Sequence, residues 1–416
     1  MVVLGSVDPA VGSGRWIGAG VGALLSEAVK SQHPRHQRLA ALDGIRGVAA
    51  VIVVLSHALL TTTIGDSYVA VLRGTGSDPA AVLLADTPLR YLFMGNEAVV
   101  IFFVLSGFVL TLPMLRGRGL DLWAYYPRRV LRLWLPVAAS VILAAAVIIL
   151  TRQTPSGALS AWVKQYSFAN LDPRKILGAM MVITGDPVIN NPLWSIKWEM
   201  LFSLLLPVAF LITLRVTRNY WLVIIAAAIV SSIGEPATVL GVKYMPMFLA
   251  GCVVAKIVHT RTTPAPASRA WLMVFGGAAL IAVPDLARVV HLPGLVQATA
   301  YAAVTVGAAM IIAGLTIPSG VTAAFASRPF RFLGRISFSL YLVHVPILIG
   351  AVHLMPSHPN EILFASIPTA FVIAVLFTLY VEEPAARLAR RVGVASASLV
   401  AKLHQGEPGR DLAPNA

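Results

Sequence analysis

The stretch "ALDGIRGVAAVIVVLSHALL", residues 41–60, decides the fold. It is long and apolar enough to cross a bilayer as one α-helix, because a hydrocarbon core of roughly 30 Å needs about 20 residues. Three ionisable side chains interrupt it: Asp43, Arg46 and His57. Ionisable groups inside a membrane span are costly and usually face a cavity or a partner. These three residues therefore mark a candidate functional site.

Apolar runs of similar length recur along the chain. Hydrophobic residues make up 57% of the 416 residues and charged residues 12%, and the mean hydropathy is +0.80. This composition excludes an ordinary soluble domain and predicts an all-α fold, a polytopic transmembrane helical bundle of about ten spans. We place the spans near residues 42–63, 97–115, 130–150, 193–214, 220–234, 240–258, 270–285, 295–317, 336–354 and 361–381.

The net charge of +14 would suggest nucleic acid in a soluble chain, but here the basic residues follow the loops. One set of loops is rich in arginine, for example residues 116–129, and the short loops of the alternate set are poor in it. The long loop at about 151–192 breaks this pattern with Arg152, Lys164, Arg174 and Lys175, but long loops obey the rule less strictly. By the positive-inside rule both termini are predicted to be cytoplasmic. We therefore expect a multi-pass protein of the inner (plasma) membrane, with the lipid bilayer and no nucleic acid among its partners. The oligomeric state is not predicted.

The chain divides into three parts. Residues 1–38 are expected to form a partly disordered cytoplasmic arm, residues 39–392 a transmembrane domain, and residues 393–416 a cytoplasmic tail of the same character. Cys252 is the only cysteine and lies in an apolar span, where we expect a small buried hydrophobe. This excludes an intramolecular disulfide and a cysteine-rich metal site, and no metal is predicted.

The polar residues of the first span form one stripe. Arg46 and His57 are eleven residues apart, about three turns and roughly 16 Å of helix, so they share a face, and Asp43 lies one turn before Arg46. In one interpretation Arg46 reaches the membrane interface and His57 bonds a neighbouring helix. In the other, His57 is a base in a hydrated pocket and Arg46 holds an anionic or carbonyl-bearing substrate.

At these residues the chain resembles the acyltransferase-3 family of integral-membrane O-acyltransferases, whose first span carries Leu-Asp-Gly, an Arg, ten residues and a His. Further segments resemble family elements in the expected order: "FFVLSGF" at 102–108, "RRVLR" at 128–132, "WSIKWE" at 194–199, "SFSLYLVHVP" at 337–346 and "YVEEP" at 380–384. Together they cover roughly residues 38–391.

The resemblance implies transfer of an acyl group, commonly acetyl, from a coenzyme A thioester to a hydroxyl, often on a sugar. A pair of arginines one turn apart suits a donor rich in phosphate. The residues assigned are His57, Arg46 and Glu199 as catalytic, Arg129, Arg132 and Arg128 as donor-binding, and Asp43, Ser106 and His344 as supporting. For Ser106 and His344 we expect mainly helix packing. Glu199 is placed near the outer end of its span, and Glu383 with Pro384 is expected to end the last span.

Several alternatives remain open at this level. His57 could act as a general base or become transiently acylated. The acceptor is expected to be a cell-envelope glycolipid or other glycan, with a glycosylated natural product such as a macrolide as the alternative. A proton-coupled secondary transporter is the competing function, because many spans with intramembrane His, Arg and Glu also suit transport. The ordered motifs and the lack of a repeat between the halves favour the enzyme.

Overall fold

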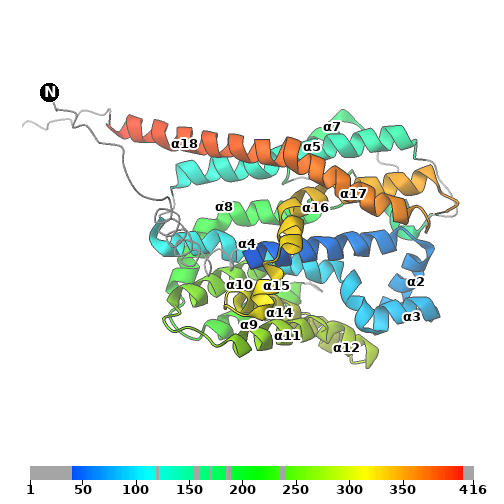
Figure 1. The fold of residues 1–416 in the computed structure, drawn as a ribbon, viewed down its shortest axis with the longest axis horizontal. Coiled ribbons are helices and arrows are strands. Elements are labelled where there is room, and N and C mark those ends of the chain that lie inside the picture. Colours follow the sequence, from blue (N-terminus) through cyan, green and yellow to red (C-terminus); the bar gives the residue numbers. More distant parts are fainter. Residues whose placement is uncertain are drawn as a thin grey trace, which may run out of the picture.

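The structure is a computed structural model that describes residues 40–118, 121–153, 159–167, 171–183, 187, 189–234, 240–358 and 360–405. All regular elements within these ranges are helices, which confirms the all-α bundle (Figure 1). The arm expected over residues 1–38 lies outside the described residues.

The long helices of the bundle match the predicted spans. Seven described helices are long and apolar enough to cross a membrane: the first span Ala40–Leu60, Gly95–Gly117 containing α4 (Gly95–Pro113), α5 (Leu122–Thr151), α8 (Leu193–Arg215), Gly241–Thr260 within α10 (Leu240–Thr260), α16 (Arg328–Leu354), and Leu363–Leu403 containing α17 (Leu363–Phe377) and most of α18 (Glu383–Gln405). The bent pair α11 (Ala267–Ile281) and α12 (Val283–Val289) could form an eighth span, and α9 (Tyr220–Gly234) and α14 (Ala302–Leu315) are shorter apolar helices. An apolar helix therefore lies at each of the ten expected places.

Shorter helices connect the spans. They are α2 (Thr63–Leu72), α3 (Pro79–Asp86), η1 (Pro88–Phe93), η2 (Met114–Arg118), α6 (Ala161–Gln165), α7 (Pro173–Met180), α13 (Gly294–Ala300), α15 (Gly320–Phe325) and η3 (Thr378–Glu382). One end of the bundle carries α2, α3 and α12, and we call it the α3 end (Figure 1). The opposite end, beyond which the last turns of α18 project, is the α18 end.

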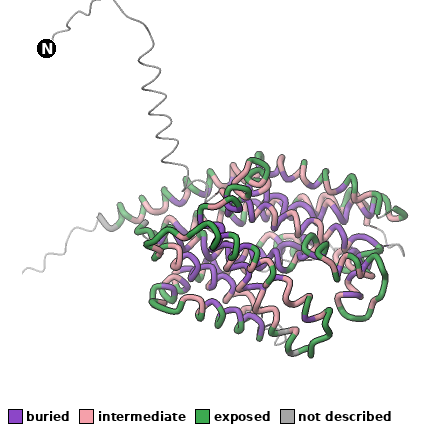
Figure 2. The backbone as a smooth tube through the Cα atoms, turned by 60° about the horizontal axis from the view of Figure 1, so that its bottom comes forward, coloured by how far each residue is buried: buried purple, intermediate pink, exposed green. Residues whose placement is uncertain are grey.

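Glycines bring the central helices into backbone contact. A Cβ at Gly107 of α4 would collide with the Phe248 carbonyl of α10, and a Cβ at Gly251 of α10 would collide with the Val104 carbonyl of α4. Small residues at such crossings are how helices pack closely in membranes. Cys252 is fully buried at the same contact, as expected. Figure 2 shows that buried residues fill the inside of the bundle while exposed residues follow its outer turns and loops.

Gly47 and Gly334 dock the first span on α16. A Cβ at Gly47 would lie 2.5 Å from the Gly334 nitrogen, so the two backbones touch near the start of each helix. α16 is the most buried of the long helices. The first-span stripe and the "SFSLYLVHVP" segment of α16 are therefore neighbours.

The last span does not end at Glu383 and Pro384, so that prediction was wrong. The chain forms a π-helical turn over η3 and continues as α18 to Gln405. Proline lacks an N–H and its ring clashes with the carbonyl four residues earlier. The wider π turn directly before Pro384 relieves this conflict without breaking the helix. Residues 393–405, expected to be partly disordered, are helical, and residues 406–416 lie outside the described chain.

The chain enters the bundle before α8 begins. The Asn190 side-chain amide donates to Ser140 Oγ in the middle of α5, at 3.2 Å, and to the Leu342 carbonyl in the middle of α16, at 3.0 Å. The Leu342 carbonyl lacks its helical partner because Pro346, four residues later, has no N–H. α8 therefore starts deep in the bundle. This corrects the placement of Glu199 near the outer end of its span: being early in the helix does not put it near a surface.

Candidate active site

Most of the predicted site residues surround one cavity of about 210 Å³, which we call the Arg46 cavity. The first span contributes Asp43 and Arg46, and the adjacent α16 contributes Ser337, Phe338 and Tyr341. Its polar lining consists of Asp43, Arg46, Ser106, Arg129, Arg132, Ser195, Glu199, Ser337, Tyr341 and Glu382. With all groups ionised it holds three guanidinium groups and three carboxylates, so it is highly charged rather than simply basic.

Two of the three arginines in the Arg46 cavity lack an ion-pair partner among the described residues. Arg46 donates from Nε to Ser337 Oγ at 2.8 Å, and Arg132 forms no ion pair with any described residue although it lines the cavity. Guanidinium groups present planar, charged donors that match phosphate and carboxylate oxygens. Arg46 and Arg132 are thus the groups best able to bind an anionic ligand in this cavity.

Arg129 and Glu199 form an ion pair inside the same cavity. Arg129 Nη2 lies 2.6 Å from Glu199 Oε1, and Arg129 Nε donates to Ser203 Oγ at 2.9 Å. Glu199 is therefore ion-paired inside the bundle. The pair joins α5 to α8 and holds both side chains in place.

His57 opens into a second cavity of about 300 Å³, the His57 cavity. Since Arg46 lies in the second turn of the first span and His57 in its last turn, this cavity is nearer the α3 end. Its walls are largely aromatic, from Tyr68, Phe93, Trp162, Tyr166, Trp194 and Tyr341, and its polar groups are Ser56, Asn96, Glu97, Asn191 and Arg90.

The His57 ring is held from two sides. His57 Nδ1 lies 2.8 Å from His344 Nε2 of α16, and the indole of Trp162 in α6 stacks on the imidazole with ring centroids 5.2 Å apart. His344 is fully buried and its Nδ1 lies 2.9 Å from the Leu340 carbonyl. The structure places His344 in direct contact with the predicted base, a relation that no spacing in the sequence reveals.

Tyr341 stands between the two cavities. Its side chain, like that of Val99 in α4, lines both of them. The Tyr341 hydroxyl lies 2.6 Å from Ser195 Oγ at the start of α8. The two cavities thus meet at Tyr341 and Val99, and the Tyr341 hydroxyl is held by a single hydrogen bond.

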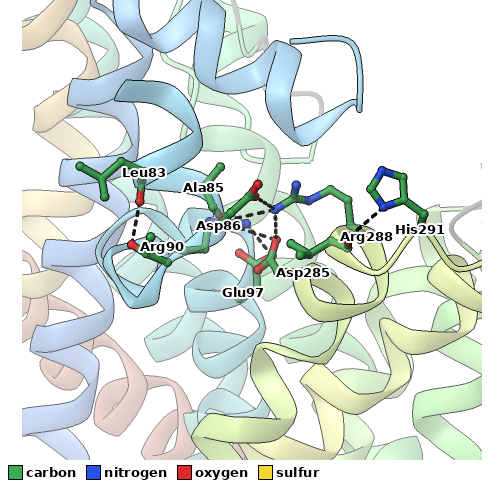
Figure 3. Close-up of polar contacts among 10 residues, drawn as sticks. Leu83, Ala85, Asp86, Arg90, Glu97, Asp285, Arg288 and His291 are labelled. Atoms are coloured by element: carbon green, nitrogen blue, oxygen red, sulfur yellow. Dashed lines mark hydrogen bonds and ion pairs between the residues drawn. The ribbon is translucent and has the colours of Figure 1, made fainter. Parts of the chain in front are cut away.

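A network of ion pairs lies at the α3 end, beside the His57 cavity (Figure 3). Arg90 of η1 pairs with Glu97 at 3.4 Å and with Asp285 of α12 at 3.2 Å. Arg288 reaches from α12 to Asp86 at the end of α3, at 2.9 Å (Figure 3). Glu97 is therefore the buried partner of Arg90. The network ties α3, η1, α4 and α12 together.

Tyr68 lies at the edge of this network. Burial raises the pKa of the Tyr68 hydroxyl to about 12, with opposing effects from the neighbouring charges. The phenol is therefore a neutral hydrogen-bond donor at physiological pH. It has no hydrogen-bond partner among the described residues and borders the His57 cavity.

The structure brings together all but one of the predicted site residues. Asp43, Arg46, Ser106, Arg129, Arg132 and Glu199 line the Arg46 cavity, while His57 lines the adjoining cavity with His344 behind it. Arg128 is exposed and lies outside both linings. Helical spacing correctly put Arg46 and His57 on one face, but the two side chains open into different cavities.

Sequence reasoning missed four residues at the site. Ser337 and Tyr341 lie within the quoted "SFSLYLVHVP" segment, so helical spacing from His344 could have singled them out. Glu382 precedes Glu383 in "YVEEP" and lines the Arg46 cavity, where it accepts from Ser339 at 2.6 Å. Trp162 comes from a short connecting helix that carries no motif. Among the described residues no group of three or more His, Cys, Asp or Glu side chains is arranged to hold a metal ion.

Comparison with known proteins places this arrangement in a family. The family model described as an acyltransferase domain, that of acyltransferase-3, matches residues 39–381, which include the lining of both cavities except Glu382. No curated protein and no solved structure gave a significant match. The chain belongs to the acyltransferase-3 family and is a multi-pass membrane acyltransferase.

Proposed function

We propose that the chain is an O-acyltransferase that moves an acyl group from acyl-coenzyme A in the Arg46 cavity to a hydroxyl in the His57 cavity. The observation that carries this proposal is the pair of adjoining cavities on either side of Tyr341. One offers guanidinium groups for phosphate, and the other offers an imidazole for proton transfer. A two-substrate transfer reaction needs both.

The donor side rests on Arg46 and Arg132. Acyl-coenzyme A carries several phosphates on a nucleotide and its thioester at the end of a thin pantetheine arm. Arg46 and His57 are separated by about 16 Å along the helix axis. The arm would cover that separation by passing Tyr341, so the phosphates would stay with the arginines while the thioester reaches His57. We propose acetyl as the group transferred.

The chemical step follows from the position of His57. Its imidazole removes the proton from the acceptor hydroxyl as the oxygen attacks the thioester carbonyl. The new C–O ester bond forms, the C–S bond breaks, and the proton passes to the leaving thiolate to give coenzyme A. Asn96 and Asn191 border the same cavity and supply neutral amide donors for the developing oxyanion.

The acceptor side rests on the aromatic walls of the His57 cavity. Aromatic rings pack against the C–H faces of sugar rings, while amide, carboxylate and hydroxyl groups bind their hydroxyls. We therefore propose a glycan acceptor, and a cell-envelope glycolipid in particular because the cavity lies inside a membrane protein. A glycosylated natural product such as a macrolide fits the same chemistry.

The direction of transfer follows from the charged loops. Arginines cluster at the α18 end, at residues 215, 218, 261, 328, 331, 335, 387, 390 and 391. We propose that this end is cytoplasmic in the plasma membrane, by the positive-inside rule. Acyl-coenzyme A, which is made in the cytoplasm, would then enter the Arg46 cavity, and the acceptor would enter from the α3 end.

Comparative lipid and metabolite mass spectrometry of a deletion strain tests the function. One species should become lighter by an acyl group, and expression of the parent chain, but not of His57→Ala, should restore it. A metabolite profile that does not change in the deletion strain contradicts the proposal.

A secondary transporter is the second candidate, because two cavities separated only by Tyr341 and Val99 also describe an occluded transport path. Purified protein in liposomes separates the two functions. Uptake of a sugar or glycolipid without coenzyme A would favour transport. Acyl transfer that depends on the thioester would favour the enzyme.

A further inference from the structure

The His57–His344 pair has a geometry that fixes where its protons lie. The rings are nearly coplanar, with planes 19° apart and centroids separated by 5.1 Å. Together with the 2.8 Å separation of His57 Nδ1 and His344 Nε2, this places the rings edge to edge rather than face to face. The contact is therefore a directed hydrogen bond in the ring planes.

The positions of the ring protons can be assigned starting from the contact between His344 and the Leu340 carbonyl. The Leu340 carbonyl can only accept a hydrogen bond, so His344 Nδ1, 2.9 Å away, carries a proton. In a neutral His344 the other nitrogen, Nε2, must then be an acceptor. His57 Nδ1 must donate to it, and in a neutral His57 this leaves Nε2 without a proton.

We infer that His344 is a positioning residue that holds His57 in the tautomer with a bare Nε2 facing the His57 cavity. His57 is half-buried and borders this cavity, and its Nε2 has no hydrogen-bond partner among the described residues. A bare ring nitrogen is what a general base needs. The other tautomer would present an N–H to the acceptor hydroxyl and could not remove its proton.

The backbone sets this tautomer. His344 is fully buried, and the carbonyl that it bonds belongs to its own helix four residues earlier. Neither partner can turn away without losing a hydrogen bond in the interior. When His57 takes the proton at Nε2, its Nδ1–H bond to His344 becomes charge-assisted and stronger, which stabilises the imidazolium. In this step His344 remains neutral and touches neither substrate.

The role of His344 as a positioning residue rests on the proposed function, but the tautomer itself can be measured without any substrate. Nitrogen-15 histidine NMR of the full chain in bilayers distinguishes a protonated from a bare ring nitrogen. The His57 signals are identified by their loss in His57→Ala. We expect Nδ1 protonated and Nε2 bare in the parent, and mixed tautomers in His344→Leu. A parent His57 with a protonated Nε2 overturns the inference, whether or not acyl transfer is found.

Kinetics provide the second arm of the test. In His344→Gln the side-chain oxygen can accept from His57 Nδ1, whereas His344→Leu offers no acceptor. We expect His344→Leu to lower kcat by at least about tenfold with the KM of both substrates unchanged, and His344→Gln to recover most of the loss. Parental kcat in a folded His344→Leu, or equal losses in both variants, contradicts the positioning role.

A matched control comes from the same helix. His353 is also buried in α16 and bonds Ser167 Oγ at 2.9 Å, and it lines neither cavity. His353→Leu removes a buried imidazole as His344→Leu does, so its thermal unfolding shows how much stability such a change costs. Its kcat should match the parent. If kcat falls as far in His353→Leu as in His344→Leu, the loss reflects general destabilisation and the inference is overturned.

Discussion

The two cavities differ in how they hold charge. In the Arg46 cavity guanidinium and carboxylate groups lie together, and one pair, Arg129 with Glu199, is in direct contact at 2.6 Å. In the His57 cavity the imidazole is bonded to the imidazole of His344 and stacked on an indole, and the one arginine among the described residues of its lining, Arg90, is ion-paired with Glu97 and Asp285. Nearby positive charge disfavours the imidazolium that a base becomes. In the proposed reaction, this separation would let one region bind the anionic donor while the other accepts a proton.

Removing the His57 imidazole should have the largest effect on acyl transfer. His57→Ala is expected to lower acyl transfer by roughly 10²- to 10⁴-fold, because a positioned general base contributes about that much. Binding of acyl-coenzyme A should persist, since the Arg46 cavity is untouched. Turnover is measured on protein that elutes as folded by size exclusion, with His358→Ala, an exposed histidine, as the control. Near-parental turnover in His57→Ala would leave the imidazole with a packing role only.

Changes in the Arg46 cavity should instead weaken binding of the donor. Arg132→Gln removes a cation that has no ion-pair partner among the described residues, so we expect the KM for acyl-coenzyme A to rise about 10-fold or more with little change in the acceptor KM. Arg132→Lys should recover only part of the loss, because a point charge lacks the planar fork. Arg128→Gln, on the exposed side of α5, is the control. An unchanged donor KM in Arg132→Gln would mean that the donor binds elsewhere.

A smaller effect is expected from the aromatic wall of the His57 cavity. Trp162→Ala should raise the acceptor KM by several-fold, since an aromatic contact is worth about 0.5–1.5 kcal/mol. The donor KM should stay the same, and Trp162→Phe should be close to the parent. Initial rates with each substrate varied in turn provide both constants. If the donor KM rose instead, the two cavities would not correspond to two substrates.

The smallest effect concerns the network at the α3 end. Arg288→Gln breaks the contact with Asp86 but leaves the pairing of Arg90 with Glu97 in place. Because partly exposed ion pairs contribute about 1 kcal/mol or less, only a slight fall in the thermal unfolding temperature is expected, with unchanged kinetic constants. A large loss of activity would show that the network shapes the acceptor cavity.

The sequence predicted the helices well because membrane spans are specified locally. Length and apolar composition decide whether a segment spans, and each of the ten expected places holds an apolar helix. The end of the last span was missed because a π turn accommodates Pro384, and this depends on several neighbouring residues at once. The depth of α8 was missed because it follows from Asn190 bonding two distant helices.

The sequence predicted which residues belong to the candidate site but not which of them contact one another. Motif residues identified Arg46, His57 and Glu199, whereas the contacts of Glu199 with Arg129 and of His57 with His344 join helices far apart in the sequence. Replacing Arg129 together with Arg132 is not a clean test of donor binding, because the loss of Arg129 leaves Glu199 unpaired inside the bundle.

The central claim is that donor and acceptor meet from opposite ends of the bundle. The most direct test uses proteoliposomes whose orientation is established by labelling Ser77→Cys at the α3 end and Arg218→Cys at the α18 end in a Cys252→Ser background. Membrane-impermeant acyl-coenzyme A is supplied on one side and a glycan extract on the other, and acylated glycan is measured by mass spectrometry. The account predicts transfer only when the thioester is on the α18 side and the glycan on the α3 side. Transfer at the same rate with the two substrates exchanged would contradict it.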